Sequence, residues 1–185
     1  GRGLDRTAMK LYYGWVIVGT GTLIIMACLG FGRFALGMLL PSMGASLGLD
    51  YAQMGFISTG NFIGYLAAVF LSGMLTAQLG ARRLITAGLA VVAASMMAVS
   101  QAQAYPQVLL LYFFTGFGAG TANVPIMALI AHWFERSLRG RAAGFIVSGS
   151  GVAIVFSGWM IPAINARVGP EGWRWSWLGR GMVLP

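Results

Sequence analysis

The 185-residue sequence has few charged residues, only four acidic residues and a single cysteine. Asp, Glu, Lys and Arg make up 9% of it, against roughly 25% in a soluble domain, whereas 58% of the residues are hydrophobic. The core of a soluble protein cannot bury so much apolar surface. Because Cys28 is the only cysteine, an intramolecular disulfide is excluded. The composition favours a membrane protein.

The sequence also lacks the motifs of enzymes and metal sites. It contains no P-loop, no zinc-spaced Cys and His residues, no paired catalytic carboxylates and no nucleophile elbow. We therefore predict no enzyme activity, no catalytic residue, no metal and no cofactor. The net charge of +8 does not indicate a nucleic-acid partner, because the arginines lie in short segments between apolar stretches instead of forming one basic face.

Long apolar stretches dominate the chain. Residues 11–32 contain no Asp, Glu, Lys, Arg or His, and at ~1.5 Å per residue they span the ~30 Å hydrocarbon core of a bilayer. We predict an all-α, polytopic transmembrane helical bundle, with a short polar leader at residues 1–10 and one transmembrane domain at 11–185. The predicted spans cover about 12–40, 51–79, 84–101, 107–134 and 142–164, and a sixth, incomplete span starts near 175.

Local signals mark several helix ends. Pro41 is predicted to end the first helix and to open a loop over 41–50. Asp50 and Gln53 have the spacing of a helix N-cap with a reciprocal partner. A basic loop is predicted over residues 132–141.

The 28 glycines include pairs with small-xxx-small spacing inside the predicted spans. In lipid the hydrophobic effect does not drive helices together, and small residues let their backbones approach closely. Close helix packing is therefore predicted at these pairs, which are Gly60 and Gly64, Gly116 and Gly120, and Gly140 and Gly144.

The basic residues predict the orientation, since cytoplasmic segments collect Lys and Arg. Eight of them would lie on the N-terminal side of the membrane, against Arg167 and Arg174 on the other side. The eight are Arg2, Arg6, Lys10, Arg82, Arg83, Arg136, Arg139 and Arg141. The chain is therefore predicted to be a multi-pass protein of the plasma membrane, the inner membrane in bacteria, with a cytoplasmic N-terminus. Tryptophans at 173, 175 and 177 fit an outer aromatic belt.

Arg33 is a charge inside the first span, eight residues before Pro41. A guanidinium inside a span costs on the order of 3 kcal/mol on insertion scales, so it needs a compensating role. Three roles remain open. Its head can reach the outer interface, it can bond to helix carbonyls, or it can face a cavity and bind an anionic substrate with its planar donor fork.

Asn123, with Thr121, is the second candidate for substrate binding, and Asn61 is the third. For each of them the alternative is a hydrogen bond to a neighbouring helix, which is common for polar side chains between spans. None of the four acidic residues, Asp5, Asp50, Glu135 and Glu171, lies inside a predicted span. Proton coupling would thus need a carboxylate from outside this chain, or the mechanism would be exchange.

The segment from Gly73 to Leu84 resembles a known signature. It reads G-M-L-T-A-Q-L-G-A-R-R-L, and it is similar to the G-x-L-A-D-R-x-G-R-R motif between helices two and three of major facilitator superfamily transporters. The matching residues are Gly73, Leu75, Gly80, Arg82 and Arg83. Ala77 stands where the signature has Asp, Gln78 where it has its first Arg, and Ala81 where it has its second.

Three other segments resemble the same family in the same order. Residues 47–55 look like the start of its second helix, residues 132–144 like its loop between helices four and five, and Gly172-Trp173-Arg174 like the approach to helix six. The resemblance covers nearly the whole chain and corresponds to the N-terminal six-helix half of a twelve-helix transporter, with a C-terminal half missing. In that family two inverted three-helix repeats build each half, and Gly30-Phe31-Gly32 with Pro41 recurs loosely as Gly116-Phe117-Gly118 with Pro125.

The resemblance implies transport of small solutes by alternating access between two six-helix halves. It implies that the first and fourth spans line the cavity, and that Gly73, Gly80, Arg82, Arg83, Arg139 and Arg141 belong to the cytoplasmic gate. Partners would be the bilayer, a small-molecule substrate with a lean toward anions, and a coupling ion. The alternative from another class is a membrane-embedded scaffold or interaction protein, or an inactive transporter remnant.

The subfamily stays open. Tyr12-Tyr13-Gly14-Trp15 and Gly149-Ser150-Gly151 look like the monocarboxylate and oxalate/formate branch. Residues 30–41 look like bacterial permeases related to the aromatic and sugar efflux branches.

Overall fold

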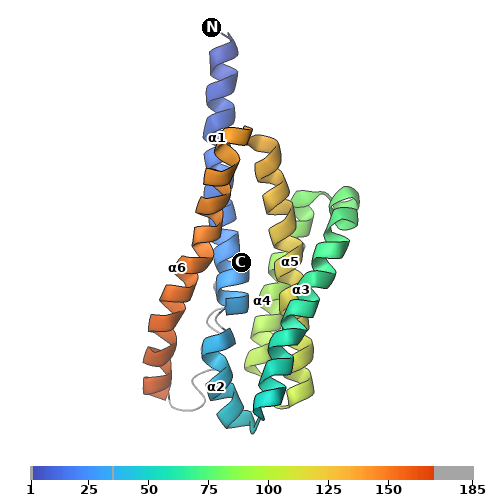
Figure 1. Cartoon of the computed structure of the whole chain (residues 1–185), viewed down its shortest axis with the longest axis vertical. Helices are drawn as coiled ribbons and strands as arrows, with labels where there is room; N and C mark the ends of the chain where they lie inside the picture. The colour runs from blue at the N-terminus through green and yellow to red at the C-terminus, as the bar shows by residue number, and fades with distance from the viewer. Residues whose placement is uncertain (1, 35, 169–185) are drawn as a thin grey trace.

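The computed structural model describes residues 2–34 and 36–168, and this part of the chain is a bundle of helices (Figure 1). At residues 2–13, 31, 33, 34 and 162–168 only the backbone is described. The segments are α1 (Arg2–Ile25), η1 (Met26–Phe34), α2 (Leu36–Leu47), α3 (Tyr51–Leu79), α4 (Ala81–Ser100), α5 (Tyr105–Trp133) and α6 (Arg136–Val168). The predicted sixth span and the tryptophans at 173, 175 and 177 lie outside the described residues.

Four of these helices are long and apolar enough to cross a membrane, namely α3, α4, α5 and residues 136–161 of α6. Their connections alternate between the two ends of the bundle (Figure 1). The start of α1 and the turns α3–α4 and α5–α6 lie at one end, and the connections α2–α3 and α4–α5 lie at the other. The prediction of an all-α transmembrane bundle is confirmed.

The first span differs from its prediction in two ways. It is not one helix, because α1 passes into the π-helix η1, in which the turns are wider than in an α-helix. Pro41 also does not end it, since α2 contains Pro41 and continues to Leu47. The prediction was wrong because proline is tolerated inside a membrane helix wherever neighbouring groups accommodate the one missing N–H donor. The polar leader is likewise helical from Arg2 onward.

The start of α3 agrees with its predicted position, whereas the start of α6 differs from it. Asp50 accepts a hydrogen bond from the backbone N–H of Tyr51 at 2.7 Å, and the Gln53 side chain accepts one from the Asp50 N–H at 3.1 Å, so the capping box is confirmed. The predicted loop over 132–141 is much shorter, because α5 ends at Trp133 and α6 begins at Arg136.

The closest contact in the described bundle joins α3 to α5, which run side by side (Figure 1). A methyl group on Gly64 would collide with the backbone carbonyl of Phe113, and one on Gly116 would collide with the carbonyl of Asn61. A methyl group on Gly120 would lie 2.6 Å from the Cβ of Ala68. Backbone therefore packs on backbone along this seam, as the glycine spacing predicts. The pair Gly140 and Gly144 was predicted wrongly, since a methyl group at either would have no described neighbour within 4 Å.

Helix α5 is also the centre of the bundle. Gly118 of α5 lies against the Gly88 carbonyl of α4, so that an added Cβ would lie 2.8 Å from that oxygen. On a third side, Gly32 of η1 lies near Thr115. Helix α6 packs on α1 and η1 as α3 packs on α5, with Gly30 against Ala153. The contact of α6 with the first span therefore corresponds to the contact of α3 with α5, as expected for two inverted repeats.

We predict that Gly116→Ala destabilises the protein by about 1–3 kcal/mol, because the added methyl group must push α3 and α5 apart. The measurement is the unfolding temperature in detergent. Gly37→Ala is the matched control, since a Cβ at Gly37 has nothing within 4 Å. Equal unfolding temperatures for the two variants would contradict the backbone contact.

Candidate functional site

The sides of α5 define where a solute could be recognised. An exposed apolar stripe on α5 includes Leu110 and Phe114. Gly116 and Gly120 face α3, whereas Thr115 and Ile126 face η1 and α1. Because an α-helix turns about 100° per residue, position 123 lies between the side that packs on α3 and the side that packs on the first span.

Asn123 therefore projects from α5 toward the angle between α3 and the first span, and its side chain is half-buried. Its Nδ2 donates a hydrogen bond to the Tyr65 hydroxyl of α3 at 2.7 Å. Its Oδ1 is buried and has no hydrogen-bond partner. Tyr65 was not among the predicted site residues, although it lies one helical turn after Asn61 and so shares its face.

Asn61 lies on the same seam, and only 1% of it is exposed. Its Nδ2 donates to the backbone carbonyl of Tyr112 at 2.9 Å, which ties α3 to α5 as the packing alternative predicted. Its Oδ1, like that of Asn123, is buried without a partner. The structure thus brings Asn61 and Asn123 to one seam, each with a side-chain oxygen left over.

Thr121 is separated from that seam. It is buried, and its hydroxyl donates to the Gly118 carbonyl of its own helix at 2.9 Å. A methyl group added at Gly88 of α4 would lie 2.6 Å from the same hydroxyl oxygen. The side chain of Thr121 therefore contacts α4, on a different side of α5 from Asn123.

Arg33 lies in η1, next to Gly32, and its side chain is outside the described part of the structure. The backbone position is informative. A Cβ on Gly32 would lie 3.5 Å from Thr115, so Arg33 sits near the level of Thr115 on α5. Segments of π-helix are frequent at functional sites, and here one carries the charge that sequence analysis singled out.

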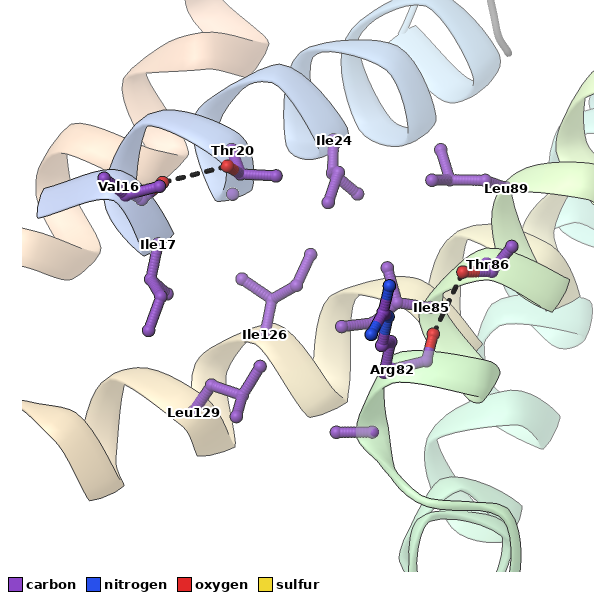
Figure 2. Close-up of a pocket in the computed structure, with 12 residues that line it drawn as sticks. Val16, Ile17, Thr20, Ile24, Arg82, Ile85, Thr86, Leu89, Ile126 and Leu129 are labelled. Atoms are coloured by element: carbon purple, nitrogen blue, oxygen red, sulfur yellow. Dashed lines mark hydrogen bonds between the residues drawn. The ribbon is translucent and has the colours of Figure 1, made fainter. Parts of the chain in front are cut away.

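The described part of the chain also has an apolar groove of about 400 Å³ between α1, α4 and α5 (Figure 2). Arg82 is the only charged residue that lines it. Figure 2 shows the hydroxyls of Thr20 and Thr86 bonded to carbonyls of their own helices, at 2.9 and 3.0 Å. Both hydroxyls are therefore already bonded within their own helices, and Arg82 is the one charged side chain in the lining.

Comparison with known proteins decides the family. Residues 22–184 match the family model of the Major Facilitator Superfamily. The chain belongs to this superfamily.

Three relatives illustrate the match. A probable hexose phosphate transport protein of Chlamydia trachomatis is 28% identical over an alignment of 140 residues that covers 70% of this chain and 31% of that protein. A 4-hydroxybenzoate transporter of Pseudomonas putida is 26% identical over 174 residues, 94% of this chain and 38% of that protein. A solved proton:xylose symporter superposes with a TM-score of 0.74 at 18% identity, over 95% of this chain and 44% of that one, and it shows the fold alone.

The chain thus spans about a third of the length of these curated relatives. Superfamily membership and the apolar helices make it an integral, multi-pass membrane protein. Its relatives are transporters and not enzymes.

The residues of the superfamily signature lie around the α3–α4 turn. Gly80 alone separates the two helices, and its φ of +78° is a conformation that side chains with a Cβ rarely adopt. Gly73 is exposed, and a Cβ there would have no neighbour within 4 Å. Arg82 and Arg83 are exposed in the first turn of α4.

The other two predicted gating arginines lie at the start of α6, at the same end of the bundle (Figure 1). Arg139 Nε donates to the Phe134 carbonyl at 2.9 Å and so fixes the α5–α6 turn. Arg141 is exposed and lines a cavity of about 250 Å³ beside Trp15. Trp15 of α1 makes edge-to-face contacts with Phe134 and Phe145, which ties the first span to this end.

We predict that Asn61→Ala lowers the unfolding temperature in detergent, because it removes the hydrogen bond to Tyr112, and interhelical bonds in membranes contribute about 1 kcal/mol. Thr59→Ala is the matched control, since Thr59 is exposed and bonds to Gly55 of its own helix. If both variants unfold at the wild-type temperature, Asn61 does not hold the helices together.

Proposed function

We propose that the chain is the N-terminal half of a secondary active transporter that moves small organic solutes by alternating access. The superfamily match over residues 22–184 carries this proposal, because it covers nearly the whole chain and only about a third of the relatives. The first span and α5 would line the translocation pathway, and a second six-helix half would close it.

We further propose that the N-terminus is cytoplasmic. The start of α1 and the turns α3–α4 and α5–α6 share one end of the bundle, and most Lys and Arg residues belong to these segments (Figure 1). Positively charged segments are retained on the cytoplasmic side. The arginines at 82, 83, 139 and 141, with Gly73 and Gly80, would then act in the cytoplasmic gate.

The proposed solute carries an anionic group. Arg33 is the support for this, because a guanidinium in a membrane span binds carboxylate or phosphate with two parallel hydrogen bonds. Two relatives are named for hexose phosphate and for 4-hydroxybenzoate, which combine an anionic group with hydroxyl groups. We propose the same class of solute, an anion that also carries hydroxyl groups, for this chain.

Coupling would depend on the other half of the protein. The acidic residues Asp50 and Glu135 lie at the ends of helices, and no Asp or Glu occurs in residues 51–134. A proton-carrying carboxylate would come from outside this chain, or the protein would exchange one anion for another.

We predict that Arg33→Ala lowers uptake of 4-hydroxybenzoate or hexose phosphate at least tenfold, because charge-assisted hydrogen bonds to the anion are lost. Arg33→Lys should restore little, since an ammonium lacks the planar fork. The assay is uptake into proteoliposomes that hold the full product of the reading frame. Arg136→Ala, an exposed arginine at the start of α6, is the control.

Full uptake by the Arg33→Ala variant would contradict the proposed preference for anions but not the proposed transport function. No saturable uptake by the wild-type protein, for either solute or a panel of neutral sugars, would instead favour the scaffold or inactive-remnant alternative.

A further inference from the structure

The groove between α1, α4 and α5 contains a cation without an acidic counterpart. Figure 2 shows the Arg82 side chain directed from the start of α4 into the groove. Its backbone carbonyl accepts a hydrogen bond from Thr86, but its guanidinium has no partner in the described part of the chain. Residues 51–134 contain no Asp or Glu. A cation beside an apolar wall interacts more strongly with an anion than a cation in water does. The groove is therefore suited to an anionic group from outside the chain.

The length of the groove is close to the thickness of one bilayer leaflet. Its lining extends along α1 from Val16 to Ile24 and along α4 from Ala81 to Leu89, which is ~12 Å on either helix. Half of the hydrocarbon core is about 15 Å. Arg82 lies in the first turn of α4, at the end of a helix that can cross the membrane. A charge at one end and an apolar wall of this length match the headgroup and one acyl chain of a lipid.

A second hollow, of about 550 Å³, lies on the exposed side of α4. It is lined by Arg82, Arg83, Thr86, Ala87 and Ala90, so the two hollows share Arg82 and Thr86. Beyond the two arginines its wall consists mainly of small, exposed alanines. One phosphate at the arginines, with one acyl chain in each hollow, would occupy both hollows at once. The arrangement fits a lipid with two tails better than a fatty acid with one.

The charges around the two hollows favour an anionic headgroup. Arg82 and Arg83 are both exposed, and the Arg83 guanidinium also has no partner among the described residues. A headgroup with an amine would place a second cation beside the two arginines, and residues 51–134 offer no carboxylate to pair with it. A headgroup that carries hydroxyls and no amine, as in phosphatidylglycerol, avoids this repulsion. Basic pockets between membrane helices are known to bind anionic headgroups.

We propose that Arg82 and Arg83 bind the phosphate of an anionic phospholipid, whose two acyl chains lie in the two hollows beside α4. Because α1 and α4 form opposite walls of the groove, the bound lipid holds the first span against α4. The inference goes beyond the proposed function, and it can be tested without any transported solute.

The first test measures which phospholipids the full product of the reading frame retains in detergent, by native mass spectrometry. From an equimolar mixture of phosphatidylglycerol and phosphatidylethanolamine with the same acyl chains, one phosphatidylglycerol should stay bound. Arg82→Gln should raise its dissociation constant at least about tenfold, because charge-assisted hydrogen bonds to the phosphate are lost. Arg136→Gln is the matched control, since it removes the same charge from an exposed position outside both hollows. Equal retention of the two lipids, or equal effects of the two variants, would overturn the proposal.

A second variant tests the position of the two tails. Ala90→Trp fills the hollow on the exposed side of α4, so diacyl phosphatidylglycerol should then bind no better than its lyso form, which has one tail. Val69→Trp adds a similar bulk at an exposed position of α3 and should leave the preference for the diacyl lipid intact. If Ala90→Trp also leaves it intact, the second hollow holds no acyl chain and the two-tailed site is wrong.

Photo-crosslinking locates the lipid. Phosphatidylglycerol with a diazirine in its acyl chain should form adducts mainly at residues that line the groove, such as Ile17, Ile24 and Leu89. Adducts at the exposed Phe62 and Phe70 of α3 in equal amount would mean that only bulk lipid was labelled, and the proposal would fail. Adducts that avoid the groove altogether would mean that another helix of the protein fills it, which would also overturn the proposal.

Discussion

The contact between the backbones of α3 and α5 is the constraint on which the rest of the structure depends. Lipid gives helices no hydrophobic reason to associate, so they must gain from close packing and a few interhelical hydrogen bonds. Gly64 and Gly116 allow that packing, and they fix the height of α3 along α5. With this height fixed, Asn61 reaches the Tyr112 carbonyl and Tyr65 reaches Asn123. The polar contacts follow from the glycine contacts.

The backbone of the first span is less regular than that of α3, α4 and α5. Its α-helix gives way to the π-helix η1, and the two glycines of η1 contact different neighbours, Gly30 on α6 and Gly32 beside α4 and α5. A tightly packed block thus stands beside a span with an irregular centre.

The sequence predicted the features that depend on length, composition and local spacing. The span over α3 and the capping box at Asp50 were of this kind, as were the contacts at Gly64 and Gly116. It failed where neighbouring helices decide the outcome. Pro41 continues a helix that it would end in a soluble protein, and no local signal announces the π-helix. Tyr65 was missed because its partner Asn123 is 58 residues away.

The central claim is that α5 presents one side to lipid and the roughly opposite side to water in the pathway. A nitroxide scan of residues 110–128 in the Cys28→Ser background tests it, with collision rates measured for oxygen and for a water-soluble nickel chelate. The account predicts an oxygen maximum at the exposed Leu110 and Phe114 and a nickel maximum at Asn123. Two profiles in phase, or nickel contact at Asn123 no greater than at Phe114, would contradict it.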